Sequence, residues 1–486
     1  MNSYIILFII AAYFGILLLI AWITGRKSSS NEAFFLGNRK SPWYIVSIGM
    51  IGTSLSGVTF VSVPGMVRSI DMTYMQTVLG FFFGYILIAK VLLPLYYKLQ
   101  LTSIYSYLDD RIGRHSYKTG ASFFLLSKIV GAAARLYLVV LILQHYVFST
   151  WNIPFAVTVV ISIFLVWLYT YRSGIKTIIW TDTLQALCLI AMLIVIIWQV
   201  KDKMQLDFAG MVQTLQASPH FRIFEFGDWH STQHFVKQFF SGIFITIVMT
   251  GLDQDMMQRN LSCRTMRDSQ INIVLTALCQ IVVILLFLAL GALIYLYIAA
   301  EGLLQPAKGD QAFALVAVQG GLPKIAGIMF VVGLVSCTYS AAGSALTALT
   351  TSFTLDILRA DGHDEKRLER LRKHTHIGMA AVMTAGILLF DRFGNDSVIN
   401  LVFKVAGYTY GPILGLFVFG LATRRKIHQR FVPLIAVASP VASYLLQLWA
   451  AERWNYAIGF ELLGYNALFC IFGLFLISYP RNETAQ

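Results

Sequence analysis

The chain has 486 residues, of which 57% are hydrophobic and only 13% are charged, and its formal net charge is +13. Its mean hydropathy is +0.69. Soluble domains carry roughly a quarter of charged residues, so this composition excludes a disordered chain, a fibrous protein and an ordinary cytosolic enzyme. The basic residues lie in short loops between apolar runs, which argues against a nucleic-acid partner and is typical of a membrane protein.

Apolar runs recur through the whole chain and predict an all-α, multi-pass protein of the inner or plasma membrane. They lack the alternation of apolar and polar residues that membrane barrel strands show. The first run is expected to be a retained helix and not a signal peptide, because no basic residue precedes it. The thirteen expected spans are 5–24, 43–67, 72–97, 121–147, 155–171, 178–198, 234–253, 271–299, 323–355, 377–391, 397–421, 431–450 and 460–478.

The distribution of Lys and Arg predicts the orientation of these spans. With the N-terminus outside, the cytoplasmic loops hold 24 of these residues and the opposite loops hold 8. This bias favours an external N-terminus and a cytoplasmic C-terminus. Segments 254–270 and 359–376 are both placed in cytoplasmic loops, and His376 is therefore expected to be solvated.

Small and hydroxylated residues interrupt the apolar pattern of span 43–67. Gly52 and Gly57 bracket Ser54 and Ser56 near its middle. Such a segment can unwind and release backbone carbonyl groups, which is tolerated at membrane depth only where the backbone lines a cavity or is buried in protein. Close packing of helices through small residues is the alternative interpretation.

A second interruption lies in span 323–355. Ser336, Ser340, Ser344 and Thr347 recur at helical spacing and predict one helix face lined with hydroxyl groups. Hydroxyl and carbonyl oxygens are hard ligands that suit a hard cation. Small-residue packing is again the alternative.

Two charged residues stand out within apolar spans. Asp182 marks an ion path or, alternatively, caps the start of a helix at the membrane interface. Arg135 lies in the middle of span 121–147, where an unpaired guanidinium costs ~3 kcal/mol or more and is expected to face the interior. Its planar fork suits a carboxylate of the solute, whereas a structural partner is the alternative.

Six stretches, in this order, resemble the sodium/solute symporter family. They are the small-residue core 51–60, Leu101–Arg111, Gly174–Gln185, Asp255–Ser262, the hydroxyl-rich segment 336–347 and Gly411–Phe417. The resemblance implies an inverted-repeat fold shared with bacterial amino-acid symporters, with a site near the bilayer midplane. The expected parts are an N-terminal flanking helix and loop (1–42), a first five-helix repeat (43–198), an extracytoplasmic loop (199–233), a second five-helix repeat (234–421) and two C-terminal flanking helices (422–486).

The resemblance also implies a main sodium site. Its ligands are expected to be the carbonyl groups of Gly52, Leu55 and Cys337 and the hydroxyl group of Ser340. The family usually has Ser or Thr at the next position, which is Ala341 here, so one oxygen ligand is missing from the family set.

A second cation site is known in part of the family. It is expected here at Asp182, Ser340 and Ser344, whereas its third hydroxyl position is occupied by Gly343. A water molecule could replace either missing oxygen, and proton coupling through Asp182 is an alternative to a second cation.

The substrate-side residues resemble those of the sialic-acid branch of the family. Its solute-contacting hydroxyl groups match Ser54, Ser56 and Thr59. Its arginine aligns with Gly131, and Arg135 lies one helical turn further along the same face.

Tyr74 and Gln76 are further candidates for lining the cavity. The resulting hypothesis is a symporter that couples inward Na⁺ flow to uptake of a small, polar, anionic solute by alternating access. The alternatives are a proton-coupled transporter of the same fold and a solute receptor without flux. No catalytic cluster is visible, so we expect no enzyme activity, no cofactor or metal beyond Na⁺, and a monomer in the bilayer.

Overall fold

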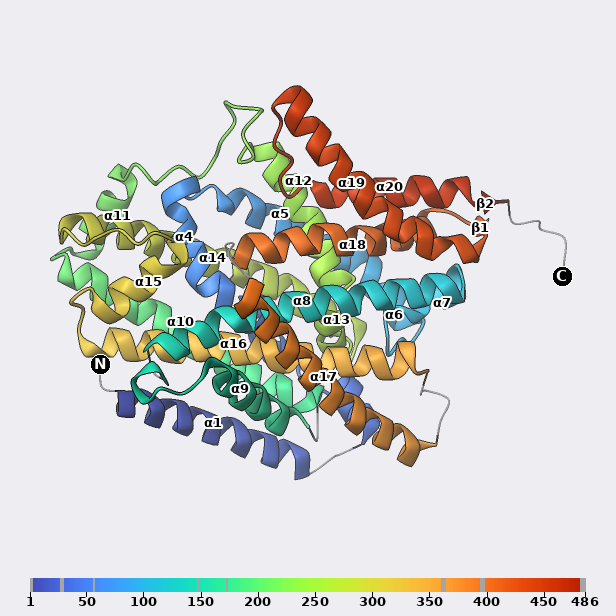
Figure 1. Cartoon of the computed structure of the whole chain (residues 1–486), viewed down its shortest axis with the longest axis horizontal. Coiled ribbons are helices and arrows are strands. Elements are labelled where there is room, and N and C mark those ends of the chain that lie inside the picture. The colour runs from blue at the N-terminus through green and yellow to red at the C-terminus, as the bar shows by residue number, and fades with distance from the viewer. Residues whose placement is uncertain are drawn as a thin grey trace.

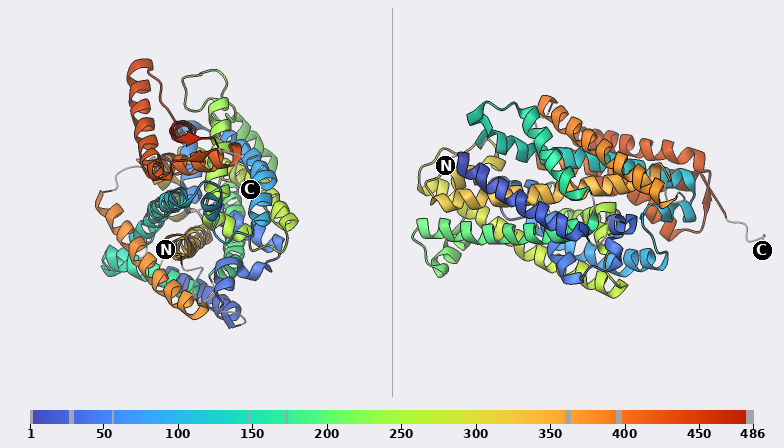
Figure 2. Two further views of the ribbon diagram at one scale, coloured as in Figure 1. Left: turned by 90° about the vertical axis from the view of Figure 1, so that its right-hand side faces the viewer. Right: turned by 90° about the horizontal axis from the view of Figure 1, so that it is seen from below.

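The computed structural model describes residues 3–26, 30–55, 57–146, 148–171, 174–359, 364–393 and 398–480. Within these ranges the chain folds almost entirely into helices, most of which run along the long axis of an elongated bundle (Figures 1 and 2). Two short strands, β1 (Lys426–Ile427) and β2 (Ser478–Tyr479), pair antiparallel. The resulting architecture is that of an all-α protein.

The first half of the chain contributes helices on both sides of the bundle centre. Pro42 and Pro154 immediately precede α3 and α9, where a missing N–H group costs nothing. The helices are α1 (Ser3–Arg26), α2 (Asn31–Leu36), α3 (Trp43–Ser54), α4 (Gly57–Ile70), α5 (Tyr74–Leu87), α6 (Leu93–Lys98), α7 (Ser106–Arg111), α8 (Arg114–Tyr146), α9 (Phe155–Thr170), α10 (Ile175–Lys203) and α11 (Phe208–Ala217).

The second half adds α16, which lies at the centre of the bundle, and two peripheral helices, α19 and α20. In Figure 1, α19 and α1 lie along opposite edges of the molecule. The helices are α12 (Phe235–Thr246), α13 (Gln254–Asn260), α14 (Met266–Ala300), α15 (Ala312–Ala314), α16 (Lys324–Ser352), α17 (Glu365–Phe393), α18 (Val398–Ala422), α19 (Val432–Trp454) and α20 (Leu462–Leu476).

Two helical rods are broken in the interior of the bundle. The pair α3 and α4 bends by 52°, and the break falls where the sequence predicts an unwound segment. The second rod continues from α12 through a π-helical turn, Ile247–Gly251, and bends by 69° before α13. Both breaks face the centre of the bundle, where they meet α16.

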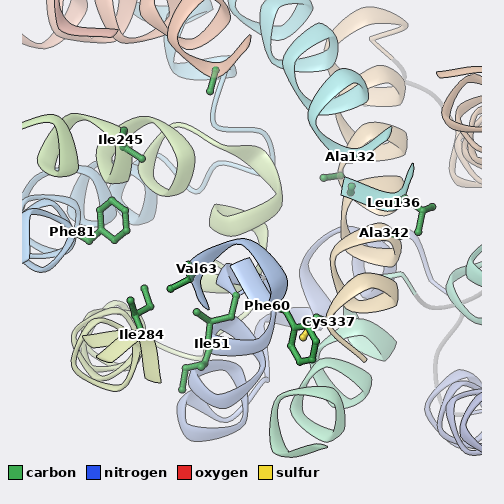
Figure 3. Close-up of a cluster of buried hydrophobic side chains, with 14 of the residues drawn as sticks. Ile51, Phe60, Val63, Phe81, Ala132, Leu136, Ile245, Ile284, Cys337 and Ala342 are labelled. Atoms are coloured by element: carbon green, nitrogen blue, oxygen red, sulfur yellow. The ribbon is translucent and has the colours of Figure 1, made fainter. Parts of the chain in front are cut away.

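The broken helix α3–α4 lies in the middle of the apolar core. Figure 3 shows Ile51, Phe60 and Val63 at the centre, with Phe81 and Ile284 to one side of them. Ile51 comes from α3, and Phe60 and Val63 come from α4, whereas Phe81 and Ile284 come from α5 and α14. All five side chains are buried. Packing around the break therefore fixes its position between neighbouring helices.

In the ranges that the structure describes, the thirteen predicted spans fall on helices or broken helices. Seven helices in the described part of the chain are long and apolar enough to cross a membrane, or up to nine if each bent pair is one span. Helices α9 and α20 are apolar but shorter. The exact number of spans and their orientation stay predictions.

We name the two ends of the bundle by the short helices that lie there. The α7 end carries α7, the start of α8 and the C-terminal strand, and the α11 end carries α11 and α15 (Figure 1).

The prediction that His376 is solvated is wrong, because its side chain is only 1% exposed and forms hydrogen bonds with Thr170 and Thr350. Although the first half of α17 is rich in charged residues, one face of this helix is buried.

Candidate functional site

The described residues enclose a cavity of about 120 Å³ beside the break between α3 and α4. Residues from α3, α4, α5, α8, α12, the π-helical turn after it, α13, α14 and α18 surround it. The lining residues are Thr53, Ser54, Thr59, Tyr74, Phe81, Tyr85, Ser127, Lys128, Gly131, Ala132, Arg135, Ile245, Thr246, Met249, Thr250, Asp253, Met256, Gln280, Ile284, Ala406 and Tyr410. The cavity is thus polar at many points although it lies within an apolar bundle.

The break itself brings several predicted site residues together. Helix α3 ends at Ser54, and Leu55 leaves the helical region with φ −92° and ψ 65°. The carbonyl groups of the last helical turn have no partner within their helix; Gly52 belongs to that turn, and Leu55 follows it as the C-cap. The Ser54 hydroxyl lines the cavity and has no hydrogen-bond partner among the described residues.

Not every predicted solute-contacting residue lines the cavity. Thr59 and Tyr74 do, and Ser56 lies outside the described residues. Gln76 is fully buried elsewhere, where its amide donates to the Gln233 carbonyl at 2.8 Å and accepts from the Glu225 N–H at 3.0 Å. Gln76 therefore holds the 199–233 segment in this structure.

Helix α16 presents the predicted hydroxyl face to the interior. Ser336, Ser340, Ser344 and Thr347 are all buried, and so is Cys337. The Ser340 hydroxyl donates to Asp182 Oδ1 at 2.7 Å and lies 3.2 Å from the Thr53 hydroxyl. The face thus makes polar contacts across the bundle, which small-residue packing alone would not require.

Asp182 does not cap a helix. It lies inside α10, which begins at Ile175, and its side chain is buried. Besides Ser340, Asp182 accepts from the Thr53 hydroxyl at 3.1 Å and from Arg259 Nη2 at 2.7 Å. The alternative of an interfacial N-cap is therefore wrong, and the carboxylate is an interior charge with three donors.

Arg259 is the first link of a buried chain of alternating charges. Its Nη1 lies 3.2 Å from Asp255 Oδ1, and Lys128 Nζ lies 2.7 Å from Asp255 Oδ2 and 3.2 Å from Asp253 Oδ1. All five side chains are at most 8% exposed. We call Asp182, Arg259, Asp255, Lys128 and Asp253 the acid–base chain.

Two hydroxyl groups complete the acid–base chain. Ser344 donates to Asp255 Oδ2 at 2.8 Å, and Tyr410 donates to Asp253 Oδ2 at 2.6 Å. Buried carboxylates are tolerated when each is paired and hydrogen-bonded in this way. The acid–base chain joins α8, α10, α13, α16 and α18, and its Lys128 lies nearer than Arg135 to the start of α8 at the α7 end.

The sequence reasoning missed Asp253, Asp255 and Arg259 as site residues. It placed 254–270 in a loop, whereas Gln254–Asn260 is a helix buried at every position. The Asp253 side chain caps this helix by accepting from the Asp255 N–H at 2.9 Å. An Asp before a short segment with opposite charges four residues apart is a helix signal that could have revealed it.

Arg135 lines the cavity from α8, two turns beyond Lys128. Its side chain forms no ion pair with any described residue, whereas Lys128 is held by two carboxylates. Arg135 is therefore the cation in this cavity that is left without a carboxylate within the described part of the chain.

Glycine stands at position 343 for a visible reason. A Cβ atom there would collide with the hydroxyl group of Tyr169. The same hydroxyl donates to the Tyr339 carbonyl at 2.6 Å, so Tyr169 is fixed between α9 and α16. The space beside the third hydroxyl position of the expected second cation site is thus occupied by the Tyr169 hydroxyl group of α9.

Two bacterial symporters are similar to this chain over most of its length. The chain is 25% identical over 466 residues to the sodium/sialic acid symporter NanT of Aliivibrio fischeri, covering 92% of this chain and 87% of the relative. It is 23% identical to the sodium/sialic acid symporter SiaT of Proteus mirabilis, covering 87% and 85%.

Two solved structures share the fold. A sodium-coupled sialic acid symporter in a substrate-bound, outward-open state has a TM-score of 0.83 at 20% identity, with 99% of both chains covered. Mhp1, a nucleobase-cation-symport-1 transporter in a closed conformation, has a TM-score of 0.54 at 14% identity, covering 92% of this chain and 94% of Mhp1.

The family model described as "Sodium:solute symporter family" matches residues 34–429, which include the cavity, both helix breaks and the acid–base chain. The chain belongs to the sodium:solute symporter family, and it is a multi-pass membrane transporter that uses sodium and is not an enzyme.

Proposed function

We propose that this protein takes up a small, polar, anionic solute, driven by the sodium gradient through alternating access. The observation that carries the anionic assignment is Arg135, which lines the cavity with no carboxylate partner in the described part of the chain. A bound carboxylate would supply that partner through two parallel N–H···O hydrogen bonds.

The rest of the lining supports a solute with several polar groups. The hydroxyl groups of Ser54, Thr59, Thr246 and Thr250 surround the same space as Arg135. The names of several relatives fit this chemistry, because sialic acid, monocarboxylates and iodide are all anions. A hydroxylated organic acid would satisfy both the guanidinium and the hydroxyl lining.

The proposed main sodium site lies where the break in α3–α4 meets α16. Gly52, Leu55 and Cys337 would give carbonyl oxygens, and Ser340 would give its hydroxyl. Ala341 offers no oxygen. The nearby Asp182 carboxylate, 2.7 Å from the Ser340 hydroxyl, would compensate in part by adding negative charge close to the ion.

The proposed second cation site, at Asp182, Ser340 and Ser344, has competitors in this structure. Arg259 Nη2 contacts Asp182 at 2.7 Å, and Ser344 donates to Asp255. A cation that binds there would have to share Asp182 with the guanidinium. We therefore propose that the main site is filled first, and that the second site fills only if the acid–base chain rearranges.

With the α7 end in the cytoplasm, as the Lys and Arg distribution predicts, the acid–base chain closes the cavity on its cytoplasmic side. Inward sodium movement is worth ~2.3 kcal/mol per charge per 100 mV of membrane potential. Release of the solute to the cytoplasm would then require Lys128 and Tyr410 to part from Asp253. We expect the order of events to be ion and solute binding first, and opening of this contact afterwards.

Uptake by purified protein in proteoliposomes tests the proposal. We expect an inward sodium gradient to drive accumulation of sialic acid, a sugar acid or a short monocarboxylate, and not of a neutral hexose. Arg135→Gln should abolish the preference for acids. Equal uptake of acid and neutral analogues by the unmodified protein would contradict the anionic assignment.

Ala341 favours two alternatives that the same preparation can separate. In a proton-coupled transporter, a pH gradient without sodium would drive uptake, and Asp182→Asn would abolish the pH dependence. In a receptor without flux, the solute would bind saturably but would show no counterflow. Sodium-driven counterflow that is insensitive to a pH gradient would exclude both.

A further inference from the structure

A second groove, separate from the cavity, lies at the α7 end of the bundle. It has a volume of about 570 Å³ and is formed by the first turns of α8 and α19. The lining residues are Arg114, His115, Lys118, Thr119, Ser122, Phe123, Pro433 and Val437. We call this set the basic groove.

Charge distinguishes the basic groove from the other polar sites of the molecule. Arg114, His115 and Lys118 line it, and no acidic residue does. None of the three forms an ion pair with any of the described residues, in contrast to Lys128 and Arg259. The neighbouring segment 422–430 adds four more basic residues and no acidic one. The groove is therefore complementary to an anion.

Along α8 the groove lining changes from basic to hydroxyl-bearing to apolar side chains, which matches the order of chemical groups in a phospholipid. Arg114 and Lys118 come first, the hydroxyl side chains Thr119 and Ser122 follow, and Phe123 comes last. A phosphate, a glycerol backbone and an acyl chain follow one another in the same order from the surface of a bilayer to its interior. On the opposite wall, Val437 lies one turn deeper in α19 than Pro433 and is exposed.

The shape of the groove is fixed by a contact between its two walls. The Gln429 amide, just before α19, donates to the Ile112 carbonyl, just before α8, at 3.1 Å. Gly113 has φ +131°, and a Cβ atom there would collide with the Gln429 side chain. Glycine thus allows the start of α19 to dock beside the start of α8, which holds the groove open between them.

We propose that the basic groove binds the headgroup of an anionic phospholipid, such as phosphatidylglycerol, with one acyl chain against Phe123 and Val437. Arg114 and Lys118 hold the phosphate, and Thr119 and Ser122 face the glycerol region. Basic pockets between transmembrane helices at the cytoplasmic surface bind anionic headgroups for the same electrostatic reason. The bound lipid would tie the peripheral helix α19 to α8, which also carries Lys128 and Arg135.

Lipid-dependent thermal unfolding of the full-length protein in detergent tests the proposal. Phosphatidylglycerol should raise the unfolding temperature more than phosphatidylcholine at equal concentration. In the double variant Arg114→Gln/Lys118→Gln, the phosphatidylglycerol concentration for half-maximal stabilisation should rise about thirtyfold, since each basic residue near a lipid surface contributes about a factor of five or six. The control Lys366→Gln/Arg367→Gln removes two exposed charges at the start of α17 and should leave this concentration unchanged.

Two further measurements distinguish a lipid headgroup from free phosphate and test the groove with a variant that keeps all its charges. Inorganic phosphate should not reproduce the stabilisation, because it lacks the acyl chain. Val437→Trp keeps every charge but fills the apolar end of the groove, and it should weaken the effect of phosphatidylglycerol. Equal stabilisation by phosphatidylcholine, equal loss in the control pair, or full replacement by inorganic phosphate would each overturn the proposal.

Discussion

The two helix breaks that border the cavity differ in their chemistry. At the first, between α3 and α4, the described side chains are neutral, and the Ser54 hydroxyl oxygen is buried without a hydrogen-bond partner among the described residues. At the second, between α12 and α13, Asp253, Asp255 and Arg259 are buried and engaged in ion pairs. The first break leaves the Ser54 hydroxyl group without a partner, whereas each charged side chain of the second break forms at least one ion pair.

This difference indicates how the work of transport is divided. Carbonyl and hydroxyl groups without partners are ready to bind a cation or a solute at no cost in broken contacts. A paired charge can respond only by giving up a partner, which makes it suited to hold one arrangement of helices until another becomes favourable. We infer that the first break binds the cation and the solute, and that the second break controls the change between helix arrangements.

The largest effect is expected from breaking the charged side of this comparison. Arg259→Gln leaves Asp182 and Asp255 with fewer partners inside the bundle, and removal of one member of a buried pair costs about 3–5 kcal/mol. The unfolding temperature in detergent should fall sharply. Arg264→Gln, an exposed neighbour, is the control and should change little. A fall of the same size in both variants would contradict the role of the acid–base chain.

A smaller but still large effect is expected for the solute. Arg135→Gln should weaken binding of an anionic solute by about thirtyfold or more, because a lost charged partner costs roughly 2–5 kcal/mol. Arg135→Lys keeps the charge but loses the planar fork, so its affinity for the anionic solute should lie between those of the unmodified protein and Arg135→Gln. Isothermal titration with the transported acid measures both. Unchanged affinity with a lower folded yield would make Arg135 a structural residue.

An intermediate effect should distinguish the ion at the neutral break. Ser340→Ala removes a proposed ligand and a donor to Asp182, so the sodium concentration for half-maximal uptake should rise several-fold, in line with ~1–3 kcal/mol for a lost partner. Ala341→Ser is the reciprocal variant and should lower that concentration. If neither variant changes the sodium dependence, the main site does not lie between α3 and α16.

The smallest effect is expected for Ser54→Ala. Its hydroxyl has no partner to lose among the described residues, so the unfolding temperature should stay within experimental error or rise slightly. Solute affinity should fall by less than tenfold, since a neutral hydrogen bond contributes about 1 kcal/mol. A strong loss of stability would show that the Ser54 hydroxyl group makes a polar contact that holds the first break.

Sequence patterns predicted the helices well because long apolar runs leave few alternatives. The break at Gly52–Gly57 and the hydroxyl face of α16 were also foreseen, since small and polar residues in an apolar run have few explanations. Family resemblance placed Asp182 beside Ser340, and the structure has the two in contact. The sodium and substrate assignments themselves stay predictions.

Charge density was the misleading signal. Arg259 and His376 both lie in charged stretches that look like loops, yet both side chains are only 1% exposed. In each case the buried face of a helix is set by partners distant in sequence, Asp182 for Arg259 and Thr170 for His376. Local composition cannot reveal such partners, because these contacts exist only once the bundle has formed.

The collision between position 343 and Tyr169 constrains how the ion stoichiometry of this chain could evolve. A hydroxylated residue at 343 requires the Tyr169 side chain to shift, because its hydroxyl group occupies the space beside Gly343. Such a shift would break the hydrogen bond from Tyr169 to the Tyr339 carbonyl. A smaller residue at 169 would make room for the new side chain at 343. Laboratory selection for steeper sodium dependence is therefore expected to yield changes at 169 and 343 together.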